Sequence, residues 1–124
     1  MCLFQILLIL VFSYFIGEER SNCGKDIGFR SVALIMLGAY TFTLSAIAES
    51  KVIDYHVIAQ IVTGISFVGA GLIIKDNGVK NLTTAITVWT SAALAVLIGI
   101  ENYKQSIIIF FTVFCILRSK HLLE

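Results

Sequence analysis

The acidic residues best suited to chemistry lie in the polar segment after the first apolar stretch. Glu18 and Glu19 close that stretch, and Asp26 follows a few residues later. Carboxylates are the protein ligands that hard Mg²⁺ accepts while it keeps most of its water. Glu18, Glu19 and Asp26 are therefore weak candidate metal ligands.

Two other interpretations of this segment use the same charges. Glu18 and Glu19 are predicted at the C-terminal end of one helix, and Arg30 at the N-terminal start of the next, so each charge sits at the unfavourable end of its helix dipole. An ion pair between Glu19 and Arg30, with Arg20 and Asp26 nearby, would resolve the conflict. The alternative is a solvated loop whose basic residues only set membrane topology. The sequence leaves all three open.

Enzyme chemistry has little support in the sequence. Neither the HExxH and GxSxG motifs nor a Walker loop is present. His56 falls in a predicted loop and His121 in the C-terminal tail, and both are predicted to be surface histidines. Cys2, Cys23 and Cys115 form no CxxC motif and are predicted to be free thiols. We expect a protein that is not an enzyme and has no resident cofactor, with Mg²⁺ as the one possible ligand.

The composition is that of a membrane protein. The 124 residues are 58% hydrophobic and only 14% charged, and the mean hydropathy is +0.94. Soluble domains carry about 25% charged residues, and a chain this small has too little interior to bury so much apolar surface. The expected partner is therefore the lipid bilayer. The net charge of +1 gives no reason to expect binding to nucleic acid.

Five apolar stretches alternate with short polar segments. A membrane span needs about 20 residues, so the first four are long enough, whereas the fifth spans only if Tyr103, Lys104 and Arg118 lie at the interfaces. The stretches are residues 1–17, 31–48, 57–74, 82–100 and 106–117. The sequence thus predicts an all-α polytopic membrane bundle of about five transmembrane helices, in a single domain over residues 1–124.

Basic residues distribute unequally between alternate polar segments. Only Lys51 and Lys104 lie on one predicted side, whereas the other side carries seven: Arg20, Lys25, Arg30, Lys75, Lys80, Arg118 and Lys120. Since the more basic side faces the cytoplasm, we expect the N-terminus outside and the C-terminus inside. Four spans would reduce the bias to five against four, so the charge count favours five.

Small residues recur every fourth position in the fourth stretch, which places them on one helix face. They are Thr87, Ser91, Ala95 and Gly99, and Thr83 extends the row. In lipid, such rows let helix backbones approach closely. We predict that this face is a helix-packing seam.

The third stretch is rich in glycine, with Gly64, Gly69 and Gly71 close together. Such glycines either form a groove for a neighbouring helix or mark a place where the helix unwinds beside a wet cavity. The first interpretation is close packing, and the second is a path for an ion or substrate. Gln60, one turn earlier, is predicted to be interfacial.

Four motifs in order resemble the MgtC/SapB family of bacterial inner-membrane proteins, over residues 13–99. They are residues 17–20 (GEER), 28–31 (GFRS), 60–71 (QIVTGISFVGAG) and 82–85 (LTTA) with Trp89. Carried over by position, the motif residues are Glu19, Arg20, Gly28, Arg30, Gln60, Gly64, Gly69, Gly71, Thr83, Thr84 and Trp89. The chain departs from the family at positions where glycine is usual: Ser13, Ser66, Asn81 and Ala95.

The resemblance implies a protein of the bacterial cytoplasmic membrane that is tied to growth when magnesium is scarce. It implies a regulatory role on other membrane machinery, including the ATP synthase; the alternative is a component of a divalent-cation transporter or channel. Many members carry a soluble domain after the fifth helix. The expectation here is that regulation by such a domain is absent or supplied by another chain.

The positions of the charged residues favour the regulatory alternative. A transporter is expected to place ionisable groups at mid-membrane, whereas every Asp, Glu, Lys and Arg here lies near a predicted helix end. We therefore expect a regulatory protein that contacts other membrane proteins or copies of itself.

Overall fold

The computed structural model describes residues 2–24, 27–47, 51–75 and 78–123, and it confirms the predicted all-α bundle. A short antiparallel hairpin joins the third and fourth helices, with Ile74 opposite Lys80. The helices are α1 (Cys2–Asn22), α2 (Phe29–Ala46), α3 (Tyr55–Leu72), α4 (Leu82–Gly99) and α5 (Tyr103–Leu123); the strands are β1 (Ile74–Lys75) and β2 (Val79–Lys80).

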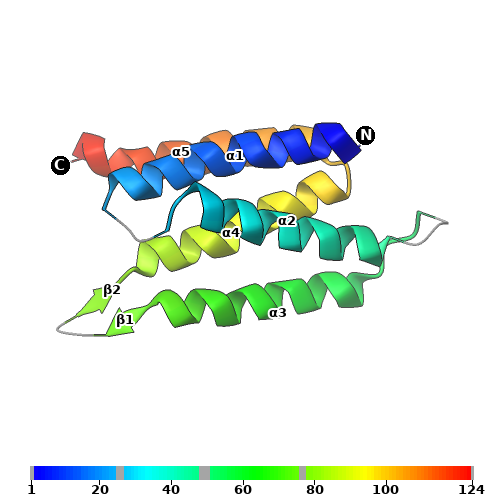
Figure 1. Cartoon of the computed structure of the whole chain (residues 1–124), viewed down its shortest axis with the longest axis horizontal. Helices are drawn as coiled ribbons and strands as arrows, with labels where there is room; N and C mark the ends of the chain where they lie inside the picture. The colour runs from blue at the N-terminus through cyan, green and yellow to red at the C-terminus, as the bar shows by residue number, and fades with distance from the viewer. Residues whose placement is uncertain (1, 25–26, 48–50, 76–77, 124) are drawn as a thin grey trace.

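Four helices, α1 to α4, are long and apolar enough to cross a membrane. Helix α5 has 21 residues and is longer than the predicted stretch 106–117. The helix includes additional residues before and after that stretch. These added residues, among them Lys104 and Arg118, lower its mean hydropathy. Figure 1 shows α5 running beside α1 along most of its length.

Successive helices run in opposite directions (Figure 1). The α1–α2 connection, the β1–β2 hairpin and the C-terminal end of α5 therefore lie at one end of the bundle. The start of α1, the α2–α3 connection and the α4–α5 connection lie at the other. These are the two sets of segments that the charge count separates, so the basic residues are concentrated at one end.

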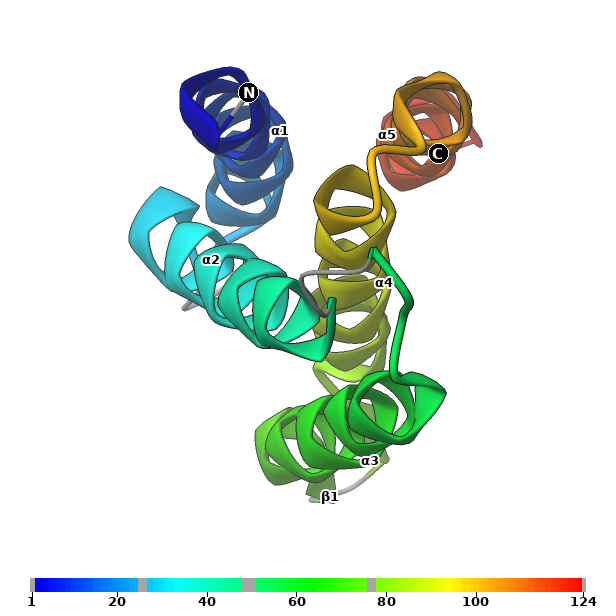
Figure 2. The same cartoon turned by 90° about the vertical axis from the view of Figure 1, so that its right-hand side faces the viewer.

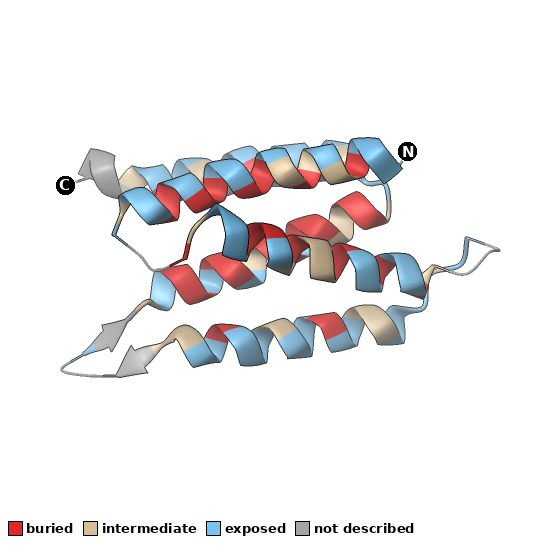
Figure 3. Cartoon of the chain, viewed as in Figure 1, coloured by how far each residue is buried: buried red, intermediate tan, exposed pale blue. Residues whose placement is uncertain are grey.

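Helix α4 is the centre of the bundle. It packs against each of the other four helices, as the end-on view in Figure 2 shows. Of the 18 residues of α4, 56% are buried, whereas only 11% of the 18 residues of α3 are buried. Figure 3 shows this contrast. Helix α3 lies at the edge of the bundle, so most of its surface faces the surroundings.

Aromatic rings join α5 to α1. Phe12 and Phe110 stack with ring centroids 4.1 Å apart and an interplanar angle of 2°, and Phe15 meets Phe114 edge-on at 5.9 Å. Offset or edge-on ring pairs each contribute about 0.5–1.5 kcal/mol beyond their buried area. This aromatic contact holds the last helix against the first.

Asn81 explains one departure from the family pattern. It is the residue before α4 and has a left-handed backbone with φ of 64°. Glycine adopts this conformation without penalty, and asparagine is among the few other residues that adopt it readily. Asparagine therefore meets the backbone requirement at this position, where the resemblance led us to expect glycine.

Candidate functional site

A buried ion pair lies at the basic end of the bundle, in the last turn of α1. Arg20 Nε donates to Glu19 Oε2 at 2.7 Å, and the two residues are only 2% and 3% exposed. Burying a charge is costly unless it is paired, so each residue makes the burial of the other possible. Arg20 also lies at the C-terminal end of α1, where the helix dipole favours a cation.

The Cys23 side chain closes this pair into a ring of three residues. Its thiol donates to Glu19 Oε1 at 3.3 Å, and Arg20 Nη2 donates to its sulfur at 3.8 Å. Both carboxylate oxygens of Glu19 therefore accept a hydrogen bond. The absence of a CxxC motif predicted only a free thiol at Cys23. Its spacing of four residues from Glu19, which places both on one helix face, is the signal that it belongs to the site.

The ion pair differs from the one predicted between Glu19 and Arg30. Arg30 is exposed in the first turn of α2, and Glu19 pairs with the next residue of its own helix instead. The dipole conflict at this helix end is resolved within α1, because Arg20 brings a cation to the same terminus. A partner on the same helix also needs no second segment to be ordered.

Two of the three predicted metal ligands, Glu18 and Glu19, differ in their surroundings. Glu18 is exposed whereas Glu19 is buried, because neighbouring residues on a helix point about 100° apart. Asp26 lies outside the described residues. Within residues 2–24, 27–47, 51–75 and 78–123, no three acidic, histidine or cysteine side chains are grouped to hold a metal ion.

A close backbone contact positions the ion pair. A Cβ atom on Gly17 would lie 2.4 Å from the Phe29 nitrogen and 2.5 Å from its Cα atom. Only glycine leaves room for α2 to begin directly against α1 at this point. Gly28, by contrast, has an extended backbone and no neighbouring atom within 4 Å of such a Cβ, so this glycine is not required by packing.

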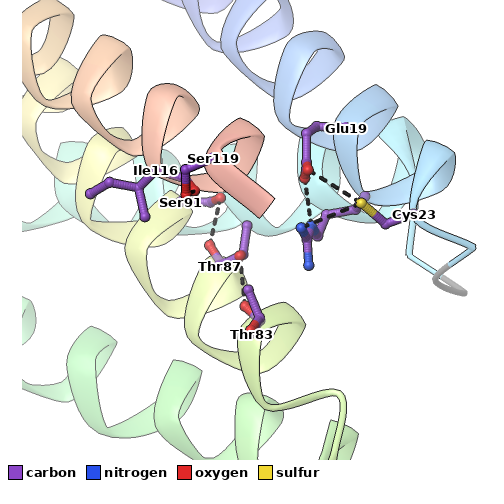
Figure 4. A network of polar contacts seen from close by, with 8 residues as sticks. Glu19, Cys23, Thr83, Thr87, Ser91, Ile116 and Ser119 are labelled. Atoms are coloured by element: carbon purple, nitrogen blue, oxygen red, sulfur yellow. Dashed lines mark hydrogen bonds and ion pairs between the residues drawn. The ribbon is translucent and has the colours of Figure 1, made fainter. Parts of the chain in front are cut away.

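A ladder of hydroxyl groups follows one face of α4, and Figure 4 draws it in the same view as the ion pair. Thr87 Oγ1 donates to the Thr83 carbonyl and Ser91 Oγ to the Thr87 carbonyl, each at 2.7 Å. Each of these hydroxyls therefore donates its hydrogen bond to a backbone carbonyl of its own helix. Thr84 differs, since its Oγ1 is buried and has no hydrogen-bond partner among the described residues.

The predicted packing seam of α4 lies mostly inside the bundle. Thr87, Ser91 and Ala95 are buried, and a Cβ on Gly99 would lie 2.7 Å from Thr43 Cγ2 of α2. Thr83, which the sequence added to the row, is exposed. The seam faces α2 at its C-terminal end, where Gly99 meets Thr43.

The glycine-rich part of α3 remains helical. Gly69 packs on α4, where an added Cβ would lie 3.3 Å from the Ala85 carbonyl oxygen, whereas nothing lies within 4 Å of such an atom at Gly64 or Gly71. Gly64 and the exposed Gln60 line an apolar groove of about 470 Å³ between α2 and α3.

The motif residues carried over from the family lie at several places in the bundle. Glu19 and Arg20 belong to the ring at its basic end, and Gln60 and Gly64 line the groove between α2 and α3. Gly69 and Thr84 are buried, whereas Trp89 on α4 is 48% exposed.

Comparison with known proteins agrees with these motifs. The profile of the MgtC family matches residues 6–124, so the chain belongs to the MgtC family. The chain is 35% identical over 112 residues to Protein MgtC of Salmonella typhimurium, covering 90% of this chain and 48% of that protein. It is 43% identical over 86 residues to Protein MgtC of Brucella abortus, covering 68% of this chain and 36% of that protein. The chain therefore spans about half the length of the Salmonella protein and about a third of the length of the Brucella protein. No solved structure matches.

Proposed function

We propose that this chain is a regulatory membrane protein that supports growth when magnesium is scarce, by helix contacts with other membrane proteins or with copies of itself. It lies in the bacterial cytoplasmic membrane with α5 as a fifth span, its N-terminus outside and its C-terminus in the cytoplasm. The observation that carries the proposal is the ring of Glu19, Arg20 and Cys23 at the end of α1, in which the Glu19 carboxylate is paired with the Arg20 guanidinium.

The ring argues against direct transport of a divalent cation. A transport site needs carboxylate oxygens that can take the place of water around the ion. Both Glu19 oxygens are already acceptors, and the other charged residues lie near helix ends. Mg²⁺ binding at Glu19 would have to break a buried ion pair, and breaking such a pair costs about 3–5 kcal/mol.

Helix α3 supports a role in contact with other proteins. Only Ile61 and Gly69 are buried along this helix, and Phe67 is 83% exposed. Small residues allow close approach of a second helix in lipid, and Gly64 stands open at the α2–α3 groove. We assign the partner-contacting surface to this groove.

Mg²⁺ flux tests the proposal against the transporter alternative. The purified chain is reconstituted in liposomes, and Mg²⁺ entry is compared with that into protein-free liposomes. We expect no added flux from protein shown to be folded. Saturable flux that is lost in Glu19→Gln would establish a transporter or channel component and refute the regulatory role.

Growth at limiting Mg²⁺ tests the contact surface. In a strain whose growth depends on this chain, Gly64→Leu fills the groove without touching the chain's own atoms at the new Cβ. We expect normal abundance and lost growth. Gly71→Leu is the matched control, since Gly71 has the same open surroundings but does not line the groove. Normal growth of the Gly64→Leu strain would show that the groove is not the contact surface.

A further inference from the structure

A second cavity opens at the other end of the bundle, away from the ion-pair ring. It has a volume of about 380 Å³ and lies between the start of α1, the ends of α2 and α4 and the segment after α2. Its walls include the apolar residues Leu44, Ile47 and Ile100. The apolar helices end here, so the cavity lies at the level where lipid headgroups meet water.

Gln5 forms a rigid polar floor for this cavity. It is 3% exposed, accepts a hydrogen bond from the Tyr40 hydroxyl at 2.6 Å and donates to the Ile98 carbonyl at 2.9 Å. A glutamine amide has two N–H groups, and the hydrogen bond to Ile98 uses one of them. A buried polar network that joins α1, α2 and α4 keeps this amide fixed in place.

Two opposite charges line the same cavity without pairing with each other. Lys51 and Glu101 are both exposed, and the ion pair formed between the described residues is that of Glu19 with Arg20. Both have left-handed backbones, with φ of 62° and 65°, a conformation that costs a non-glycine residue about 1–2 kcal/mol. The cavity thus presents a cation and an anion at separate points of its rim.

This pattern of charge selects a zwitterion. We propose that the cavity binds the phosphoethanolamine headgroup of a membrane lipid, with its ammonium at Glu101 and its phosphate at Lys51 and the Gln5 amide. The C-terminal ends of α2 and α4 add to the attraction for the ammonium, since both point here and neither has a basic residue in its last turn. The apolar walls contact the glycerol and the start of the acyl chains.

Other ligands fit this cavity less well. An anionic lipid would pair with Lys51 but would face the uncompensated carboxylate of Glu101, and a divalent cation would be repelled by Lys51. Phosphatidylcholine carries the same two charges, but its quaternary ammonium has no N–H to donate. A primary ammonium donates three hydrogen bonds, and charge-assisted hydrogen bonds to a carboxylate are the strong ones.

Lipid retention measured by native mass spectrometry tests the proposal. The purified full chain in neutral detergent is given equal amounts of phosphatidylethanolamine, phosphatidylcholine and phosphatidylglycerol with identical acyl chains. We expect phosphatidylethanolamine to be retained about fivefold more than either of the others, the ratio that one favourable charged contact gives. Equal retention of the three lipids by the unmodified chain would overturn the proposal.

Neutral substitutions locate the site. Lys51→Gln and Glu101→Gln remove one charge each, keep the number of side-chain heavy atoms and leave a non-glycine residue in the left-handed conformation. Each should abolish the preference for phosphatidylethanolamine. Lys104→Gln is the matched control, because Lys104 is exposed at the same end but does not line the cavity. A preference that survives in Glu101→Gln contradicts the assignment. Displacement of the lipid by an equal concentration of soluble phosphoethanolamine would show that the headgroup alone is bound, and would overturn the lipid assignment.

Discussion

Replacing Gly17 by alanine should destabilise the protein through one close backbone contact. The added Cβ would meet the Phe29 nitrogen at 2.4 Å and its Cα atom at 2.5 Å. Since both atoms belong to the backbone, the whole start of α2 must move. Overpacking of this kind costs about 1–3 kcal/mol, against a gain of about 0.5–1 kcal/mol for replacing glycine within a helix. With the cost at the upper end of its range, because backbone cannot rotate away, we expect a net loss of about 2 kcal/mol.

Gly64→Ala is the matched control for this prediction. It makes the same chemical change inside a helix, but the new Cβ has no neighbour within 4 Å. Only the gain from replacing glycine by alanine within a helix remains. This variant should therefore be more stable than the unmodified chain by about 0.5–1 kcal/mol. The two variants should therefore differ by about 3 kcal/mol, the sum of the two effects.

Unfolding in mixed micelles provides the measurement. Increasing fractions of a denaturing detergent unfold the protein, and the fluorescence of Trp89, the single tryptophan, follows the transition on α4. The midpoint should move to less denaturant for Gly17→Ala and to more for Gly64→Ala. Equal midpoints for both variants would refute the reasoning, because they would mean that α2 can shift away from α1 without cost.

Three further predictions concern other contacts. Gly99→Ala should lose about 1–3 kcal/mol of unfolding free energy, because its Cβ would lie 2.7 Å from Thr43 Cγ2; Thr43→Ser removes that methyl group and should restore part of the loss, whereas no rescue would place the strain elsewhere. Arg20→Met should lose about 3–5 kcal/mol by removing the guanidinium that pairs with the buried Glu19 carboxylate, and adding Glu19→Gln should recover most of it in the same unfolding assay; additive losses would contradict the ion pair. A reporter fused to the C-terminus should be active in the cytoplasm, and a periplasmic signal would exclude a fifth crossing by α5.

The sequence predicts the helices well but ends the first one too early. The charged residues after Gly17 indicate the end of a span, whereas α1 continues to Asn22. It continues because Glu19 and Arg20 neutralise each other and are buried, and a pattern of residue types does not show whether two charges are paired. The predicted fifth stretch is also too short, but for another reason. Lys104 and Arg118 belong to α5 although both are exposed, so a charged residue marks the end of an apolar stretch without ending the helix.

The polar contacts between helices could not be predicted from the sequence. Gln5 is the one strongly polar side chain inside the first apolar stretch, which is a signal that it needs a partner. Its partners on α2 and α4 depend on how three helices are rotated against each other, and residue spacing within one helix does not specify this. The regular row of small residues in α4 carried more information, because residues four apart share one face of a helix.

The alternating direction of the five helices has a consequence for protein engineering. Cys2 and Leu123 lie at opposite ends of the bundle (Figure 1). With five crossings, as proposed above, two copies joined in tandem by a short linker would be inserted with opposite orientations. A concatenated pair with both copies in the same orientation needs one additional membrane span in its linker, and a native parallel dimer is most simply made from two separate chains.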